Sequence, residues 1–131
     1  MNDKLARLKQ VILVKLLLTI FVWGIPSLLA PPVLLEIFGI PTADLTINRF
    51  FGVALIAMSV AYWFAYKDPL RNLAVIWMLI VDNGLAVLVI VVLGFTLRLS
   101  WFFWLSAVIA FLFFLAFLIL VPKSDVYRKP V

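Results

Sequence analysis

Few side chains in this sequence could do chemistry. The chain has no histidine and no cysteine, which excludes disulfides, thiol redox chemistry, iron–sulfur clusters and cysteine-ligated zinc. The missing histidine also removes the commonest transition-metal ligand and the side chain best suited to proton transfer near neutral pH. Six acidic residues, three tyrosines and a few hydroxyls remain, and they form no visible catalytic constellation. We therefore expect no enzyme, and no catalytic, cofactor-binding or metal-binding residues.

Two ionisable residues, Arg49 and Asp82, lie clearly beyond the membrane interface within long apolar runs. A charge deep in a transmembrane helix costs about 2.5–3.5 kcal/mol on insertion scales, and it usually faces protein, water or an opposite charge. Asp82 lies about ten residues from either end of its run, which places it near the bilayer midplane. Our first interpretation is an intramembrane ion pair between Arg49 and Asp82. A role of Asp82 in proton, ion or substrate handling, or in contact with another subunit, stays open.

The composition identifies the elements that must position these residues. Of 131 residues, 67% are hydrophobic and 13% are charged, against about 45–50% and 25% in soluble domains. A globule this small cannot bury so much apolar surface. Four apolar runs each match the ~20 residues that span a bilayer as a helix. They predict an all-α fold, a four-helix transmembrane bundle that fills residues 1–131 as a single domain, with spans at 11–30, 47–66, 73–93 and 101–121. The first run is too long for a signal peptide and is read as a retained helix.

Proline and glycine punctuate the connection between the first two spans. Pro32 suits the first position of a helix, and Gly39 suits the left-handed residue just past a helix end. We expect a short helix at residues 33–38 that lies along the outer membrane surface, with Val33 and Ile37 facing apolar groups. Thr42 or Asp44 could then cap the second span.

The other connections are short, which makes neighbouring spans antiparallel. Asp68 is the expected cap of the third span, with Pro69 as its first helical residue. Ser100 can cap the fourth span, and Pro122 ends it.

The second span carries two stripes at helical spacing. Arg49, Gly52, Ser59 and Trp63 share one face, and Ala54, Ala57, Ala61 and Ala65 fall on nearly the opposite face. Small residues let helices approach closely in lipid. We therefore expect the second span to be central and packed on both sides. In contrast, the phenylalanines of the fourth span point all round it, as is typical of a helix that faces lipid or a subunit.

Residues 38–77 (FGIPTADLTINRFFGVALIAMSVAYWFAYKDPLRNLAVIW) carry a family resemblance. Phe38-Gly39 precedes the second span, Arg49-Phe50-Phe51-Gly52 opens it, and an acidic residue follows in the next span. This pattern resembles the DoxX-like group of small four-helix bacterial membrane proteins. The resemblance implies the four-helix fold, and some members of the group are similar to small subunits of quinone-linked membrane oxidoreductases. It assigns no catalytic residue.

Basic residues predict the orientation of the chain. Eight of the eleven lysines and arginines share one side of the predicted bundle, two lie toward the other side, and Lys15 lies about a turn inside the first span, from where it can snorkel to the surface. The positive-inside rule then places both termini in the cytoplasm, in the inner (plasma) membrane of a cell. The eight are Lys4, Arg7, Lys9, Lys67, Arg71, Lys123, Arg128 and Lys129; the two are Arg49 and Arg98.

The net charge of +5 does not predict nucleic-acid binding, because no basic stripe with stacking aromatics lies outside the apolar runs. The lipid bilayer and a protein in the membrane are the expected partners. The leading functional prediction is a non-catalytic accessory subunit or scaffold within a larger membrane complex. The alternative is a small transporter or a lipid- or quinone-binding protein with a pocket near Asp82. Four-helix drug exporters place an acidic residue in their first helix, and none occurs there here.

The orientation can be tested with single cysteines, since the chain has none of its own. We expect an impermeant thiol reagent outside intact cells to label a cysteine at Thr96 and not one at Ser124. The reverse pattern would contradict the orientation, and labelling of both would contradict the four-helix count.

Overall fold

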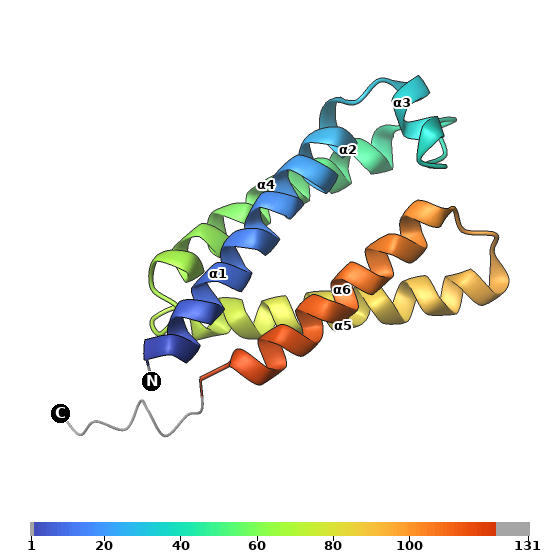
Figure 1. Ribbon diagram of the computed structural model, residues 1–131. Helices are drawn as coiled ribbons and strands as arrows, with labels where there is room; N and C mark the ends of the chain where they lie inside the picture. Colours follow the sequence, from blue (N-terminus) through green and yellow to red (C-terminus); the bar gives the residue numbers. More distant parts are fainter. Residues whose placement is uncertain (1, 123–131) are drawn as a thin grey trace.

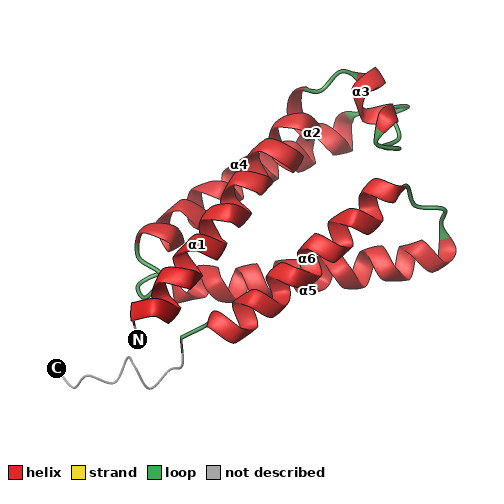
Figure 2. Cartoon of the chain, viewed as in Figure 1, coloured by secondary structure: helices red, strands yellow, loops and turns green. Residues whose placement is uncertain are grey.

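The protein is an all-α membrane protein, as the composition predicts. The computed structural model describes residues 2–122, and no strand occurs among them. Four helical segments are long and apolar enough to cross a membrane. The first is built from α1 (Asn2–Leu18), η1 (Thr19–Gly24) and α2 (Ile25–Leu29), and the others are α4 (Thr46–Lys67), α5 (Leu73–Thr96) and α6 (Trp101–Leu120). A short helix, α3 (Pro32–Ile37), connects the first two (Figure 2).

The first span changes its hydrogen-bonding pattern at its middle. Residues Thr19–Gly24 form a π-helix, and the N–H of Ile25 bonds to the carbonyl of Ile20. Pro26 follows directly and has no N–H of its own, so a regular α-helix could not continue through it with every carbonyl satisfied. The wider π turn is one of the local adjustments by which a transmembrane helix accommodates a proline.

The α3 helix ends as its glycine predicts. Gly39 has φ +69°, the N–H of Gly39 bonds to Glu36 O, and the N–H of Ile40 bonds to Leu35 O. These two bonds form a Schellman motif. Leu35 is the buried residue of this helix, and Val33 and Ile37 are exposed on the surface of the protein. Their expected contact with apolar groups at the membrane surface stays a prediction. Both sides of this helix are apolar, so periodicity alone could not tell which one faces the bundle.

The boundaries of the other spans differ by a few residues from those expected. A four-residue turn at 69–72 follows Asp68, so α5 begins at Leu73 and not at Pro69. Asp44 does accept the N–H of Thr46 at 2.8 Å, and this bond at the start of α4 lowers the pKa of its carboxyl. Ser100 is the residue before α6, but its hydroxyl donates to Phe38 O at 2.7 Å and caps nothing.

The spans form two antiparallel pairs that diverge. The first span packs on α4, and α5 packs on α6. Figure 1 shows the pairs close together near the N-terminus and apart toward α3. We call these ends the N-terminal side and the far side. Two sets of contacts join the pairs toward the far side. The indole N–H of Trp23 donates to Ser106 Oγ at 3.2 Å, and the ring of Phe38 packs against the rings of Trp101 and Phe102.

The tightly packed core lies toward the N-terminal side. Its members come from α1, the second half of α4, the first half of α5 and the second half of α6. They are Leu8, Ile12, Leu16, Tyr62, Ala65, Ile76, Leu79, Ile80 and Phe117. One apolar core thus joins the pairs on the N-terminal side, whereas a few polar and aromatic contacts join them on the far side.

Gly52 lets α4 approach the first span closely. A Cβ atom at Gly52 would lie 2.6 Å from the backbone nitrogen of Leu28 and 2.9 Å from Gly24 O. Backbone atoms of a packed helix cannot move aside as a flexible side chain could. The face of α4 that carries Arg49, Gly52 and Ser59 therefore packs on the first span.

The expected packing on the opposite face of α4 is wrong for its far half. Ala65 is fully buried, but Ala54 and Ala57 are exposed. The physical reason is the divergence of the pairs: α5 leaves α4 beyond their short connection, so only the alanine nearest that connection is covered.

Basic side chains gather on the N-terminal side, where α1 and α5 begin and α4 ends. Lys4, Arg7, Lys9, Lys67 and Arg71 all lie there. The tail residues Lys123, Arg128 and Lys129, together with Ser124, lie outside the described residues. The cytoplasmic placement of this side remains a prediction.

Replacing Gly52 tests the close approach of α4 to the first span. We expect Gly52→Ala to destabilise the protein by about 1–3 kcal/mol, because the added methyl group overpacks against backbone. The measurement is thermal unfolding in detergent. Ala54→Val, which adds carbon on the exposed face of the same helix, is the control and should change little. Equal effects of the two changes would contradict the contact.

Candidate functional site at the centre of the bundle

A lysine and a carboxylate meet near the middle of the bundle. Lys15 Nζ lies 3.6 Å from Asp82 Oδ2 and donates to Asn83 Oδ1 at 2.9 Å. Lys15 is 13 residues into the first span, about 20 Å from its start, and Asp82 is about 14 Å from the start of α5 at 1.5 Å per residue. Both lie well inside a hydrocarbon layer of about 30 Å. The pair joins the first span to α5, and so one helical pair to the other.

Asn83 holds its position through a second bond. It is fully buried, and its amide nitrogen donates to Leu79 O at 2.6 Å. Its amide oxygen is then free to accept from Lys15. The ring of Phe113 on α6 lies 5.6 Å from Lys15 Nζ and adds a cation–π contact. Three spans therefore contribute to the environment of one ammonium group.

Two hydroxyl groups at this depth lack a hydrogen-bond partner among the described residues. They belong to Thr19, where the π-helix begins, and to Tyr62 on α4. Both residues are buried. The Tyr62 hydroxyl lies near the Asp82 carboxylate but forms no hydrogen bond with it. Buried hydroxyls are nearly always paired, so these two are exceptions among the described residues.

The predicted ion pair between Arg49 and Asp82 is wrong. Arg49 lies only about 4.5 Å inside the far end of α4, whereas Asp82 lies about 21 Å inside the far end of α5 at 1.5 Å per residue. The third span was expected to end at residue 93, but α5 continues to Thr96, which places Asp82 deeper below the far end. Lys15 takes the place of Arg49. It does not snorkel to the surface: its side chain is 13% exposed and points into the bundle.

Arg49 binds the end of the first span instead. Its guanidinium donates to Ser27 O at 3.0 Å and to Ala30 O at 2.7 Å, and the amide of Asn48 donates to Ser27 O at 3.1 Å. Ser27 O would ordinarily accept from the residue four positions on, which is Pro31 and has no N–H. A cation at a helix C-terminus also complements the helix dipole. Arg49 thus caps the C-terminal end of α2, which two prolines follow.

Asp82 is the less covered member of the central pair. Its side chain is 35% exposed, although it lies at a depth where water is absent. Met78, Leu85 and Val89 share its face of α5, at helical spacings of four, three and seven residues, and are 36%, 54% and 51% exposed. We call these four residues the Asp82 face. One edge of the carboxylate opens onto the outer surface of the bundle.

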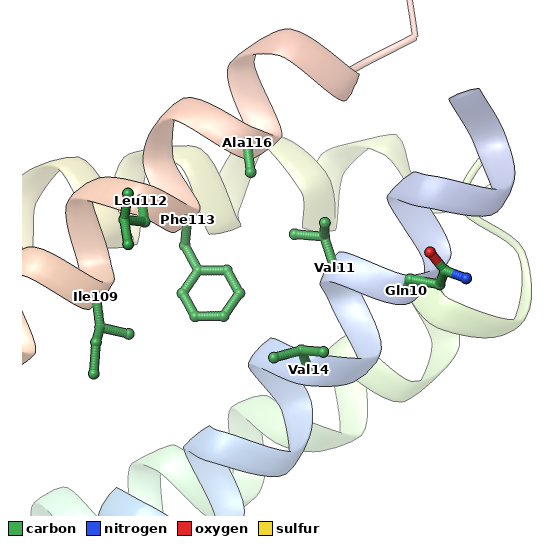
Figure 3. A pocket seen from close by; sticks show the side chains of 7 residues that line it. All are labelled: Gln10, Val11, Val14, Ile109, Leu112, Phe113 and Ala116. Carbon is green, nitrogen blue, oxygen red and sulfur yellow. The ribbon is translucent and has the colours of Figure 1, made fainter. Parts of the chain in front are cut away.

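A separate apolar groove runs between α1 and α6. It has a volume of about 320 Å³ and is lined by Gln10, Val11, Val14, Ile109, Leu112, Phe113 and Ala116. Figure 3 shows these side chains facing one another across the groove, with Phe113 reaching from α6 toward α1. Phe113 therefore separates the groove from the Lys15 ammonium.

Sequence reasoning missed Lys15 and Asn83 as members of the site, and two signals could have revealed them. Lys15 falls on the same helical face as Leu8, Ile12 and Thr19, all of which are buried. Asn83 follows Asp82 directly in an otherwise apolar run. A polar pair of adjacent residues in such a run indicates an interior face, because neither residue gains from facing lipid.

Comparison of the chain with protein-family models, with curated proteins and with solved structures finds no match. The resemblance to the DoxX-like group therefore remains a prediction. Its two motif residues have structural explanations here, since Arg49 caps the first span and Gly52 permits close helix packing.

The arrangement supports charge neutralisation and hydrogen bonding within the membrane. Across residues 2–122, no three His, Cys, Asp or Glu side chains lie together as metal ligands. The central groups are one ammonium, one carboxylate, one amide and two hydroxyls, contributed by α1, η1, α4 and α5. They can bind a polar group or hold two helical pairs together.

Two double-mutant cycles distinguish the observed pair from the predicted one. Breaking a buried pair on one side typically costs about 3–5 kcal/mol, whereas replacing both partners can be nearly neutral. We expect Lys15→Met and Asp82→Leu each to lower thermal stability in detergent, and the double variant to recover much of the loss. For Arg49→Leu with Asp82→Leu we expect the losses to add. Additive losses in the first cycle would contradict the pair.

Proposed function

We propose that this chain is a non-catalytic membrane subunit, and that its Asp82 face meets a partner protein within the bilayer. The observation that carries the proposal is the exposure of the Asp82 carboxylate, 35% of whose side chain is uncovered near the midplane. A charge at that depth is costly against lipid. A partner that covers the open edge with a hydrogen-bond donor would remove the cost.

The other intramembrane charges support the same proposal. Arg49 bonds to two carbonyls at the end of the first span, and Lys15 bonds to Asp82 and Asn83. Neither cation is left over for substrate binding or proton transfer. The pairing of the charges favours a scaffold over a catalyst or a transporter. The residue that stays partly uncovered lies on an outer surface, where a neighbouring protein has access to it.

A second candidate function is the binding of a lipid-soluble ligand with a polar head. It is favoured by the buried, unpartnered hydroxyls of Thr19 and Tyr62 beside the central pair. A carbonyl or hydroxyl group of such a ligand, entering past the Asp82 face, could satisfy them.

Site-specific photo-crosslinking in native membranes tests the proposal. We expect a photoreactive amino acid at Leu85 to crosslink to one partner protein that also co-purifies in stoichiometric amounts in mild detergent. The matched control is the same amino acid at Ile119 on α6, which is 70% exposed and should give no such product. Asp82→Asn should reduce the crosslink at Leu85, because it removes the charge while keeping the shape.

The remaining outcomes contradict the proposal in distinguishable ways. A crosslink from Leu85 only to a second copy of this chain would identify a homo-oligomer and not a subunit of a larger complex. A crosslink only to a small lipid-soluble molecule would favour the second candidate.

A further inference from the structure

We propose that the groove between α1 and α6 binds one acyl chain of an anionic phospholipid, whose phosphate is held by Arg7. This site is distinct from the Asp82 face and does not depend on the proposed function. It concerns the membrane leaflet on the N-terminal side.

The lining of the groove selects an apolar occupant. All of its lining residues are apolar except Gln10, which lies at the end nearest the membrane surface. Its volume of about 320 Å³ corresponds to roughly ten water-sized volumes of about 30 Å³. That is room for part of one hydrocarbon chain and too little for a whole lipid.

The length and depth of the groove match one leaflet. On α6 it extends from Ile109 to Ala116, a rise of about 10 Å at 1.5 Å per residue. Half of the hydrocarbon layer is about 15 Å thick. A chain that follows the groove inward from the surface therefore stays within its own leaflet; it passes the Phe113 ring and ends near Ile109.

Arg7 supplies the charge that makes the site selective. Helical geometry places Arg7 on the same face of α1 as Val11 and Val14, four and seven residues away, and one turn nearer the surface. Its side chain is exposed, as is that of Lys4 one turn further out. Neither forms a salt bridge with another described residue. The phosphate of an anionic lipid in the groove would lie beside the Arg7 cation, which neutralises its charge. A lipid without net charge does not require this neutralisation.

Native mass spectrometry of the purified full chain tests this site. The protein is exposed in detergent to an equimolar mixture of phosphatidylglycerol and phosphatidylcholine with identical acyl chains. We expect phosphatidylglycerol to be retained preferentially. Arg7→Gln should reduce its retention about fivefold, as expected for one basic residue near an anionic headgroup. Val14→Trp should reduce it by filling the groove.

Two control variants keep the test specific. Arg71→Gln removes an exposed charge on the same side, and Leu118→Trp introduces the same side chain on the opposite face of α6; both should retain the lipid as the unmodified chain does. Equal retention of the two lipids, or an equal loss from Arg71→Gln, would overturn the role of Arg7. Undiminished binding by Val14→Trp would overturn the role of the groove. Arg7 is exposed, so its replacement leaves the fold intact, and circular dichroism checks this.

Discussion

The contact between Lys15 and Asp82 is the interaction on which the arrangement of the helices depends. Hydrocarbon cannot solvate either charge, so each requires the other within the bundle. Because the lysine belongs to the first span and the aspartate to α5, meeting this requirement brings the two helical pairs together. The apolar core lies on the N-terminal side of this contact, and the pairs diverge on the other side. A pair of charges thus marks the boundary between the packed half and the open half.

The packed half and the open half of the bundle differ because different kinds of contact hold their helices together. Toward the N-terminal side, buried residues from all four spans interlock. Toward the far side, the first span and α4 are held by Gly52 and by the bonds of Arg49 to backbone carbonyls, whereas the contacts to α6 are a few polar and aromatic ones. This second set leaves surfaces of α4 and α5 uncovered. A small chain with such surfaces is suited to contact other membrane components along its sides.

Much of the fold could be predicted from the sequence, because the hydrocarbon interior of a membrane allows a chain to form few structures. The number of spans, the short helix before the second one and the left-handed Gly39 all follow from hydropathy and from proline and glycine chemistry. The central pair could not be predicted with the same rules. Arg49 and Asp82 were matched by depth alone, and Lys15 was placed near the surface because the first span was taken to begin at Val11. The helix in fact begins at Asn2, which moves Lys15 to mid-span.

Rotation of the helices about their own axes is the other property that the sequence left undetermined. The alanine stripe of α4 and the two apolar sides of α3 each offered two acceptable packings, and only tertiary contacts decide between them. Arg49 illustrates the same point, since its partners are backbone carbonyls at the end of the first span, and backbone acceptors leave no mark in a residue pattern. A polar residue in an apolar run therefore predicts that its side chain forms a hydrogen bond or an ion pair. Which residue is its partner follows only from the packed structure.

Exchange of the two central charges tests the account most directly. Lys15→Asp and Asp82→Lys each place two like charges where the native opposite charges lie 3.6 Å apart. Each single variant should either lose its folded structure in detergent or unfold at a much lower melting temperature. The account predicts that the doubly exchanged variant, which restores the opposite charges in reverse order, regains most of the melting temperature of the unmodified chain. A double variant no more stable than the weaker of the two single variants would contradict the claim that this pair joins the helical hairpins.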